Sequence, residues 1–444
     1  MLLNEKEAKQ ITDKILSYVK ADDATVSVTS NKYSNLRFAR NAYLTSGNTV
    51  SRGANITVWI KGKRGSSSTS SLDDTSLRAM VEQAEEIANI SPVDRQYLPS
   101  VGKQKYKRSN GFAEETANIS LPNRAKSVSE ILRQSEKEGV ISAGFHEARA
   151  VASGFATKNG NFGYEKRTFA NLSMTARTPD GTSSGYFSRS DVNVKDLDTD
   201  RVAKESIRKA IEGREARTID PGAYTVILEP QAVGDLIGRV TGQFNARRAE
   251  EGRSAFSVKG GKTKLGQQVF DSKINILSDP WNSEIPASPS AQAGLPAEKI
   301  YLVKNGVVRN LTYSRYWAKR KKTDPTPGPV NTIFESSGES SSFDEIIKST
   351  KKGLLIGRFW YIRGTDARTA SYTGLTRDGV WMVENGKIAY PVKNLRFNQS
   401  FIAMLADGNV EMIGKPERIG GGNASLLPTL KLKEFNFTSQ SEAV

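Results

Sequence analysis

Apolar positions in the first half of the chain switch between helical spacing and strand spacing. Between residues 4 and 20 they recur every three or four positions, as in an amphipathic helix, whereas Ile56, Val58 and Ile60 alternate with polar residues, as on one face of a strand. From about residue 121 the same order of helix, strands and helix returns, which predicts a duplicated α+β half. The expected helices cover residues 4–20, 74–89, 123–139 and 199–213, and the expected strands cover 24–29, 34–40, 54–61, 140–151, 168–177 and 183–190.

After Pro221 the pattern changes to short apolar runs separated by turn residues. The dipeptide Asn385-Gly386 accepts positive φ at both central positions, so it predicts a tight hairpin. Segments 324–329 and 336–342 are rich in proline, glycine and serine, which indicates loops. The expected strands of this half cover 223–228, 274–277, 299–308, 354–362, 379–384 and 387–391.

These patterns predict an α+β protein with two domains. The N-terminal α+β domain is expected at 1–217, built from two similar units at about 1–95 and 119–217, each with helices on an antiparallel sheet. The β-rich domain is expected at 218–444, with a barrel-like or sandwich-like arrangement.

Composition excludes several classes of protein and of site. The chain has 444 residues, of which 37% are hydrophobic and 25% charged, as in globular proteins. No apolar run has the length of an export signal or a membrane span, so we expect a cytoplasmic protein made without export. Cysteine is absent, which excludes disulfides, thiolate catalysis and thiolate metal ligands.

The formal net charge of +16 could attract nucleic acid, acidic peptides or an acidic partner. The basic residues are scattered along the chain, and no zinc-finger, helix-turn-helix or RNA-recognition signature accompanies them. A solvated basic surface is therefore favoured over a nucleic-acid site.

The densest ordered run, from Gly353 to Gln399, and its continuation to Gly414 resemble the C-terminal domain of the TldD/PmbA family. These bacterial and archaeal proteins were first labelled gyrase modulators and later understood as metallopeptidases and their partner subunits. The resemblance implies that catalytic members carry HExxxH on a helix after the first strand of this domain. In that motif two histidines bind zinc, the glutamate activates the bound water, and a cysteine near the C-terminus completes the metal shell.

The stretch that matches this motif lacks its chemistry. Pro230 stands at the first histidine, Gln231 at the glutamate and Asp235 at the second histidine. Proline has no ligand atom, glutamine is not a carboxylate base, and no cysteine exists to complete the shell. We therefore expect no metal, no cofactor and no catalytic residue, and a helix from 230 to 248 retained as scaffold.

Other candidate motifs are weak. The only histidine, His146, is followed by a glutamate, but no second histidine completes a zinc motif, so we expect a surface or packing role. Gly181 to Gly185 matches GxSxG but lies between two expected strands, which favours a hairpin turn.

Three further residues are candidates for a peptide channel. After the glycines at 420–422, Asn423 and Ser425 could hold a peptide backbone by hydrogen bonds. Arg377, beside an aromatic run, could pair with Asp378 or hold a peptide carboxylate.

The resemblance implies a catalytically silent, TldE/PmbA-like subunit. Such a subunit pairs with a zinc-bearing TldD-like subunit, or forms a homodimer, around a channel that admits unfolded peptides. A hydrolase using Asp235 with Glu229 or Asp271 is one alternative, and a nucleic-acid-binding module, resting on the charge and the older family label, is another.

Overall fold

A computed structural model describes residues 2–420 and 424–441. Its N-terminal half is one antiparallel sheet of six strands in the order β3-β2-β1-β4-β5-β6. The strands are β1 Asp23–Ala39, β2 Ala42–Ile60, β3 Lys63–Thr69, β4 Ile141–Thr157, β5 Phe162–Arg177 and β6 Ser184–Asp191. The central strands β1 and β4 pair from Thr25 opposite Thr157 to Ala39 opposite Ala143, so the two expected units share a single sheet.

Four helices cover one face of this sheet. They are α1 Glu5–Tyr18, α2 Asp74–Ile90, α4 Leu121–Lys137 and α5 Thr199–Glu212. Val26 and Val28 of β1 pack with α1 and α2, and Leu36 packs with α4 and α5. Because side chains two residues apart share a face of a strand, all three point to the same side of the sheet. The order helix, three strands, helix thus occurs twice, as the pattern predicts.

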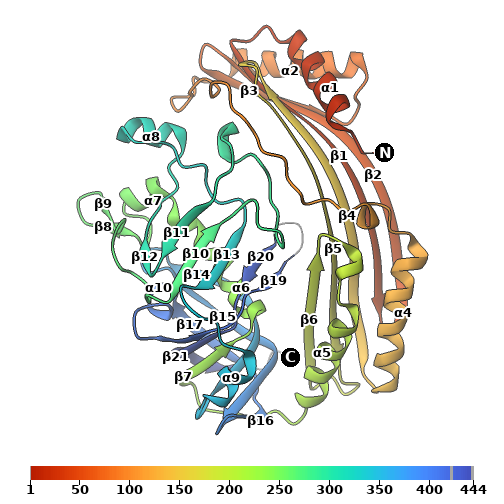
Figure 1. Ribbon diagram of the computed structural model, residues 1–444, viewed down its shortest axis with the longest axis vertical. Coiled ribbons are helices and arrows are strands. Elements are labelled where there is room, and N and C mark those ends of the chain that lie inside the picture. Colours follow the sequence, from red (N-terminus) through yellow and green to blue (C-terminus); the bar gives the residue numbers. More distant parts are fainter. Residues whose placement is uncertain (1, 421–423, 442–444) are drawn as a thin grey trace.

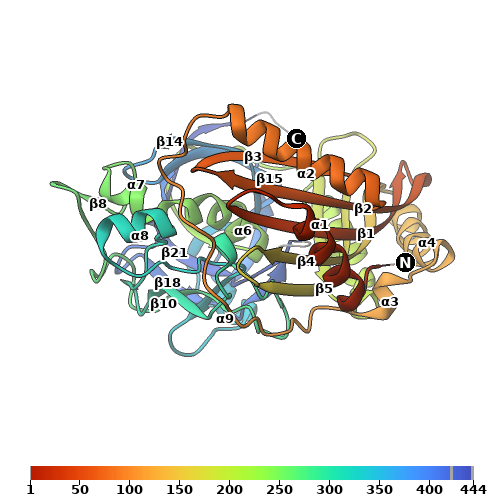
Figure 2. The same cartoon turned by 90° about the horizontal axis from the view of Figure 1, so that it is seen from above.

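The C-terminal half lies against the opposite, concave side of the sheet (Figures 1 and 2). Its centre is a barrel, because the strand order β14-β7-β21-β17-β15 is closed by a further pairing of β14 with β15. The barrel strands are β7 Gly222–Leu228, β14 Lys352–Asp366, β15 Ser371–Glu384, β17 Leu395–Ser400 and β21 Leu430–Gln440. Two more strands, β16 Lys387–Pro391 and β18 Val410–Ile413, pair with β15 and β21. The predicted α+β class and barrel-like second half are confirmed.

A second sheet and the helix α6 Pro230–Val240 complete this half. The sheet has the order β12-β11-β10-β13-β20-β19. Its strands are β10 Ile274–Ser278, β11 Ile300–Lys304, β12 Val307–Val308, β13 Thr332–Ser336, β19 Glu417–Ile419 and β20 Ser425–Leu427. The shorter elements are α3 Glu114–Ala117, α7 Ala246–Glu250, α8 Arg315–Lys321, α9 Phe343–Lys348, α10 Phe401–Met404, β8 Ser257–Val258 and β9 Lys262–Thr263, with 3-10 turns η1 Val194–Asp196, η2 Thr241–Phe244 and η3 Gln292–Gly294.

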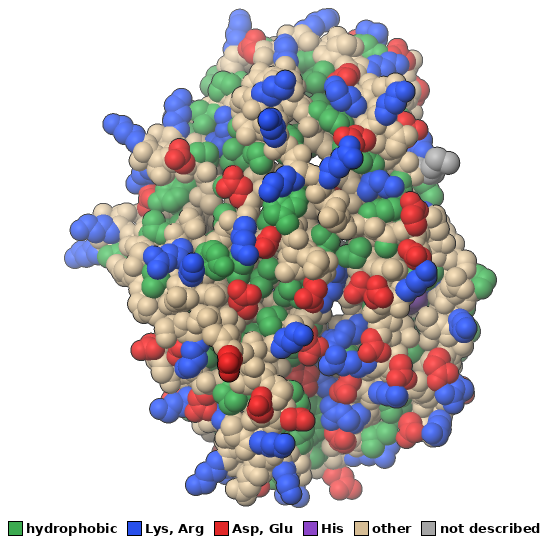
Figure 3. Space-filling model, viewed as in Figure 1, with side chains coloured by type: hydrophobic (Ala, Val, Ile, Leu, Met, Phe, Trp, Pro, Cys, Tyr) green, Lys and Arg blue, Asp and Glu red, His purple; other side chains and the backbone are tan. Residues whose placement is uncertain are grey.

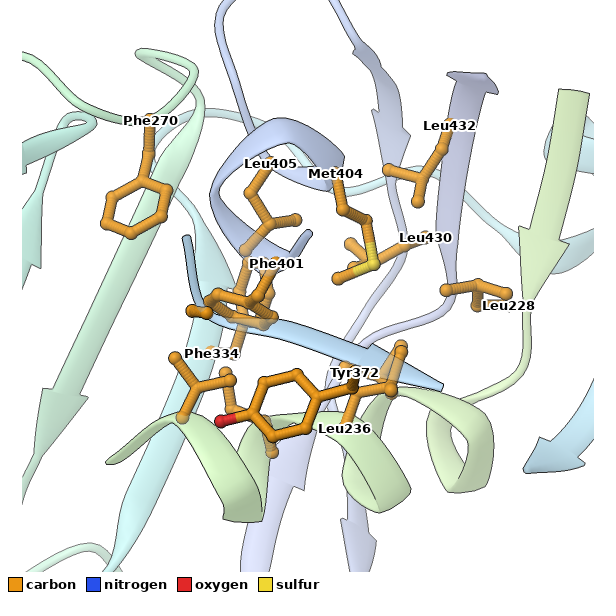
Figure 4. Packing of buried hydrophobic residues seen from close by; sticks show 14 of the residues in the cluster. Leu228, Leu236, Phe270, Phe334, Tyr372, Phe401, Met404, Leu405, Leu430 and Leu432 are labelled. Atoms are coloured by element: carbon orange, nitrogen blue, oxygen red, sulfur yellow. The ribbon is translucent and has the colours of Figure 1, made fainter. Parts of the chain in front are cut away.

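One buried cluster joins α6 to the barrel and to the second sheet. Leu236 of α6 lies beside Tyr372 of β15 in this cluster (Figure 4), and the Tyr372 hydroxyl donates to the carbonyl of Arg239 at 2.9 Å. Phe359 and Phe435 stack with ring centroids 5.5 Å apart inside the same cluster. The position of α6 is therefore set by packing on both sides. Within the described residues, no helix is long and apolar enough to cross a membrane.

Some local predictions are confirmed and others are wrong. Asn385 and Gly386 have φ of 49° and 75°, so the predicted hairpin is present. The strands expected at 24–29 and 34–40 are one strand, because the buried Ser30 hydroxyl accepts the Leu3 N–H at 2.8 Å and the polar segment stays paired on both sides. The helix expected at 230–248 is broken, because Asn245 accepts the Arg248 N–H and starts the separate helix α7.

Candidate functional site

Helix α6 starts directly after the barrel strand β7. Glu229 occupies its N-cap position, and Pro230 follows in the first turn. Proline suits this turn, because its missing N–H would have no helical partner there. The backbone N–H of Glu229 donates to the carbonyl of Ile356 on β14 at 3.0 Å, which fixes the start of the helix against the barrel. Pro230 thus has a structural role where the first motif histidine would stand.

Gln231 and Asp235 lie one turn apart on α6 and bond to each other. Gln231 Nε2 donates to Oδ1 of Asp235 at 2.9 Å, and the backbone N–H of Phe359 donates to Oδ2 at 2.8 Å. Burial raises the pKa of Asp235 from 3.8 to about 6, although both hydrogen bonds and the nearby Arg358 favour the charged form. Both carboxylate oxygens are thus engaged, Oδ1 within α6 and Oδ2 in a bond that ties the helix to the barrel strand β14.

Pro230 and Gln231 line a cavity of about 330 Å³ between the two halves, here called the α6 cavity. Lys209 of α5 is 1% exposed, and its Nζ lies 2.5 Å from Oε2 of Glu229. The charged residues that line the cavity are Arg189, Arg201, Glu205, Arg208, Lys209, Glu229 and Glu417. These seven side chains form four ion pairs among themselves. The cavity is therefore rich in charged groups, four cations against three carboxylates, and each of them takes part in an ion pair.

The aromatic ring of Phe187 on β6 is shared by cations of this cavity. The Arg189 guanidinium lies 4.3 Å from its centroid and Lys209 Nζ lies 5.4 Å from it. Burial lowers the pKa of Arg189, and Glu417 opposes that change. Together with Lys209 and Glu229, these contacts join the N-terminal sheet to the start of α6.

The residues at the motif positions do not fit zinc. Pro230 has no side-chain ligand atom, Gln231 is neither an imidazole nor a carboxylate and its nitrogen is bonded to Asp235, and both Asp235 oxygens accept hydrogen bonds. Among residues 2–420 and 424–441, no group of three or more histidine, cysteine, aspartate or glutamate side chains could hold a metal ion. His146 lies on β4 of the N-terminal sheet and is fully buried, and that burial lowers its pKa to about 4.

Arg377 and its neighbour lie at another contact between the halves. Arg377 Nε is 3.7 Å from Oδ2 of Asp378, and the same oxygen is 3.2 Å from Arg358. The hydroxyl of Ser184, on β6, donates to Oδ1 of Asp378 at 2.7 Å. The Arg377 guanidinium also lies 5.2 Å from the centroid of Trp360. Segment 373–379 belongs to β15, and only Asp378 and Gly379 take positive φ within it.

The remaining residues predicted from the sequence, Ser425, Asn423 and the segment 181–185, are not part of α6. Ser425 begins β20 and pairs with Thr332 of β13 and with Ile419 of β19. Asn423 lies outside the described residues. The 181–185 segment spans the end of the connection between β5 and β6 and the first two residues of β6, as expected near a hairpin turn.

Family models account for most of the chain. The model of the PmbA/TldA metallopeptidase C-terminal domain matches residues 221–439, that of domain 1 matches 24–88, and that of the central domain matches 112–214. The chain belongs to the PmbA/TldD family. The predicted family resemblance is therefore confirmed.

Relatives of this PmbA/TldD protein carry peptidase names. A protein of Methanothermobacter thermautotrophicus named metalloprotease is 23% identical over 51% of this chain and 50% of its own length. The chain spans about half the length of the curated relatives it matches.

Solved structures share the fold across almost the whole chain. A proposed modulator of a DNA gyrase from Thermotoga maritima has a TM-score of 0.85 and 18% identity, covering 97% of this chain and 100% of its own. TldE from Thermococcus kodakarensis has a TM-score of 0.85 and 14% identity, covering 97% and 99%.

Sequence reasoning missed Lys209, the buried cation of the α6 cavity in this PmbA/TldD chain. Lys209 lies on the same face of α5 as Val202 and Ser206, which are both buried. A lysine on the apolar stripe of a helix is the signal that could have identified it, because buried lysines need a partner. That partner, Glu229, was considered only as a catalytic alternative.

Proposed function

We propose that this chain is a non-catalytic, TldE/PmbA-like subunit of a metallopeptidase. Its partner is a zinc-bearing, TldD-like member of the same family, which supplies the metal and the cleavage of unfolded peptides. The pair is a heterodimer, and a homodimer of this chain is the arrangement expected when the partner is missing.

One observation carries this proposal. Asp235 is the single carboxylate at the motif positions, and both of its oxygens accept hydrogen bonds, one from Gln231 within α6 and one from the Phe359 N–H of β14. Recruiting Asp235 to a metal would break these bonds, and the chain has one histidine and no cysteine to assist it. A helix that has exchanged ligands for structural contacts fits a subunit that shapes the complex without cutting.

The non-catalytic subunit contributes wall and contact surface in this proposal. Extended peptides are held through main-chain hydrogen bonds with little sequence preference. We assign that role to the surroundings of Ser425, Asn423 and Arg377, which follow the α6 region in the family's C-terminal domain.

The alternatives have less support. Glu229 is paired with Lys209, and the carboxylate of Asp271 accepts the N–H groups of Lys273 and Gly408, so neither is poised beside Asp235 as a second catalytic group. Basic and acidic side chains are interspersed over the face seen in Figure 3, whereas nucleic-acid sites gather cations along one surface.

The test combines this chain with a zinc-bearing family member. Cleavage of an unfolded peptide is measured for each protein alone and for the mixture, with co-elution in size-exclusion chromatography as the pairing measurement. We expect no cleavage by this chain alone, and more cleavage by the mixture than by the partner alone. Zinc-dependent cleavage by this chain alone, lost in Asp235→Ala, would contradict the proposal.

A further inference from the structure

A second, larger cavity lies between the concave face of the N-terminal sheet and the C-terminal half. Its volume is about 690 Å³, about twice that of the α6 cavity. The sheet contributes residues of its first five strands, β1 to β5. The segment between α2 and α3 contributes residues from 94 to 101, and the C-terminal half contributes residues of the loop 289–294 and of the start of α8. In Figure 1 this α2–α3 segment runs between the sheet and the C-terminal half. We call this space the junction cavity.

The walls of the junction cavity are held together by direct hydrogen bonds. The Asp23 carboxylate of β1 accepts the Ser100 N–H at 2.7 Å, which fixes the α2–α3 segment to the sheet. On the other side, Arg315 donates to the carbonyl of Pro99 at 2.6 Å, and the Tyr106 hydroxyl donates to the carbonyl of Gly294 at 2.6 Å. A cavity whose three walls are tied in this way is preformed, so a ligand does not have to order them.

Aromatic rings dominate the chemistry of these walls. Five of the 24 lining residues are aromatic, namely Trp59, Tyr97, Phe155, Tyr164 and Tyr316. Trp59 and Tyr97 stack with centroids 5.5 Å apart. The Tyr97 hydroxyl donates to Asp23, so this residue offers a ligand mainly ring surface. The Tyr164 ring packs with the helices on the other face of the sheet, and its hydroxyl donates to the carbonyl of Leu3, so the ring surface of the sheet wall comes from Trp59 and Phe155.

Charge separates this cavity from the α6 cavity. Only four of its 24 lining residues are charged, two cations (Arg64, Arg315) and two carboxylates (Asp94, Glu165), against seven of 16 in the α6 cavity. Glu165 also lies 3.1 Å from Arg167. A balanced and sparse set of charges favours an uncharged ligand over a phosphate or a metal ion.

Hydroxyl groups supply the remaining polarity. Seven lining residues are serine or threonine, among them Thr57 and Ser153 of the sheet and Ser290 of the loop. A hydroxyl can rotate to donate or to accept, and it retains an acceptor lone pair when it already donates. Such groups can meet the amides of a peptide in an extended conformation without requiring a particular sequence.

We propose that the junction cavity binds the aromatic side chain of an extended peptide, between the rings of the sheet and Tyr316 of α8. This inference rests on the proposed function, because it takes the unfolded peptide as the ligand of the chain. It adds a preference for aromatic residues and places the binding site away from the α6 cavity.

The test measures peptide binding to the full-length chain without any partner. The probe is a fluorescein-labelled flexible peptide with one central tryptophan, and the comparison is the same peptide with alanine there. We expect the tryptophan peptide to bind about tenfold more tightly or better in fluorescence anisotropy, since the ring is removed from water. Equal affinity for the two peptides would overturn the proposal.

Variants locate the binding. Tyr316→Ala removes one wall of the cavity, and Ser290→Trp fills the cavity from the loop. Each variant is expected to bind the tryptophan peptide about tenfold more weakly and to leave the affinity for the alanine peptide unchanged. Tyr43→Ala, at the far hairpin of the sheet, is the matched control and should bind normally. If circular dichroism shows that Tyr316→Ala does not fold, Ser290→Trp serves as the test, and normal binding of the tryptophan peptide by Ser290→Trp would overturn the proposal.

Competition identifies the ligand class and separates the two proposals. N-acetyl-tryptophan amide should displace the labelled peptide, and displacement by adenosine at lower concentration would instead assign the cavity to a nucleobase. If the chain stimulates a zinc-bearing partner but does not prefer the aromatic peptide, only the cavity proposal fails. If it prefers the aromatic peptide but does not stimulate the partner, only the proposed function fails.

Discussion

The charge state of Asp235 gives a quantitative prediction about the stability of the protein around helix α6. We consider Asp235→Asn, which keeps the size of the side chain and removes its charge. The asparagine Oδ1 can still accept the Phe359 N–H, and the Gln231 amide can rotate so that its oxygen accepts the new NH₂ group. The substitution thus isolates the cost of a buried negative charge.

The sign follows from the direction of the pKa change. Burial raises the pKa of Asp235 from 3.8 to about 6, so between these values the folded state holds a proton that the unfolded state has released. Stability therefore falls as pH rises through this window, and the full cost is present above about pH 6. At about 1.4 kcal/mol per pKa unit the cost is about 3 kcal/mol. Asp235→Asn carries no such charge and avoids this cost. The difference in unfolding free energy between the variant and the wild type should therefore increase by about 3 kcal/mol, in favour of the variant, from about pH 4 to about pH 8.

Thermal unfolding of both proteins at about pH 4 and about pH 8 measures this difference. For a cooperative unit of roughly 200 residues, about 3 kcal/mol corresponds to about 6 to 12 °C in Tm. Asp73→Asn is the matched control, because hydrogen bonds from Ser71 and Ser76 lower the pKa of this exposed N-cap to about 2 and its contribution has the opposite pH dependence. A change in stability of Asp235→Asn that is the same at both pH values would refute the reasoning.

Four further results are expected. Lys209→Met leaves the carboxylate of Glu229 without its partner and should lower the unfolding free energy by about 3 to 5 kcal/mol in a denaturant titration. The double variant Lys209→Met/Glu229→Gln should recover most of this loss. A loss below about 1 kcal/mol in the single variant would show that the ion pair is not buried as described. Gly185→Ala places a Cβ 2.3 Å from the Ser206 carbonyl oxygen and should destabilise by about 1 to 3 kcal/mol, whereas Gly102→Ala, with open space around it, should stay within about 0.5 kcal/mol. Elemental analysis of the purified chain should find far less than one zinc per molecule, and a stoichiometric value would overturn the reading of Pro230, Gln231 and Asp235. Arg377→Ala should leave the Tm of the isolated chain within a few degrees of the wild-type value, and it should weaken either binding to the partner subunit or cleavage of peptides by the complex. A much lower Tm together with normal activity in the complex would assign Arg377 a structural role.

The periodicity of the sequence predicted the elements well where one face of each is buried. The helix expected at 74–89 is α2, with Leu77 and Val81 buried on its apolar face, and the hairpin at Asn385-Gly386 follows from backbone freedom alone. Periodicity could not predict the closure of the barrel, because that depends on the pairing of β14 with β15 and on the distant strand β21. It also could not predict that β1 and β4 join both units in one sheet, since strand pairing leaves no local pattern.

The sequence gives the residue types at the candidate site but does not predict how their side chains are arranged. The letters at 230, 231 and 235 show that zinc ligands are missing, but they do not show what replaced them. The Phe359 N–H reaches Asp235 from a strand far along the chain, and Lys209 reaches Glu229 across the contact between the halves. Such contacts depend on tertiary structure, so a single sequence does not contain them.

The buried ion pair of Glu229 and the hydrogen bond of Asp235 give α6 a structural role that does not depend on catalysis. Glu229 at the N-cap binds Lys209 of the N-terminal half, and Asp235 one and a half turns later binds the Phe359 backbone of the barrel. The helix therefore joins the sheet half to the barrel at its start and along its length. Substitutions in it should act first on stability and on the relative position of the two halves, because that is what its polar side chains bind. If a partner subunit contacts both halves, the same substitutions would weaken assembly without any change in the partner's own zinc chemistry.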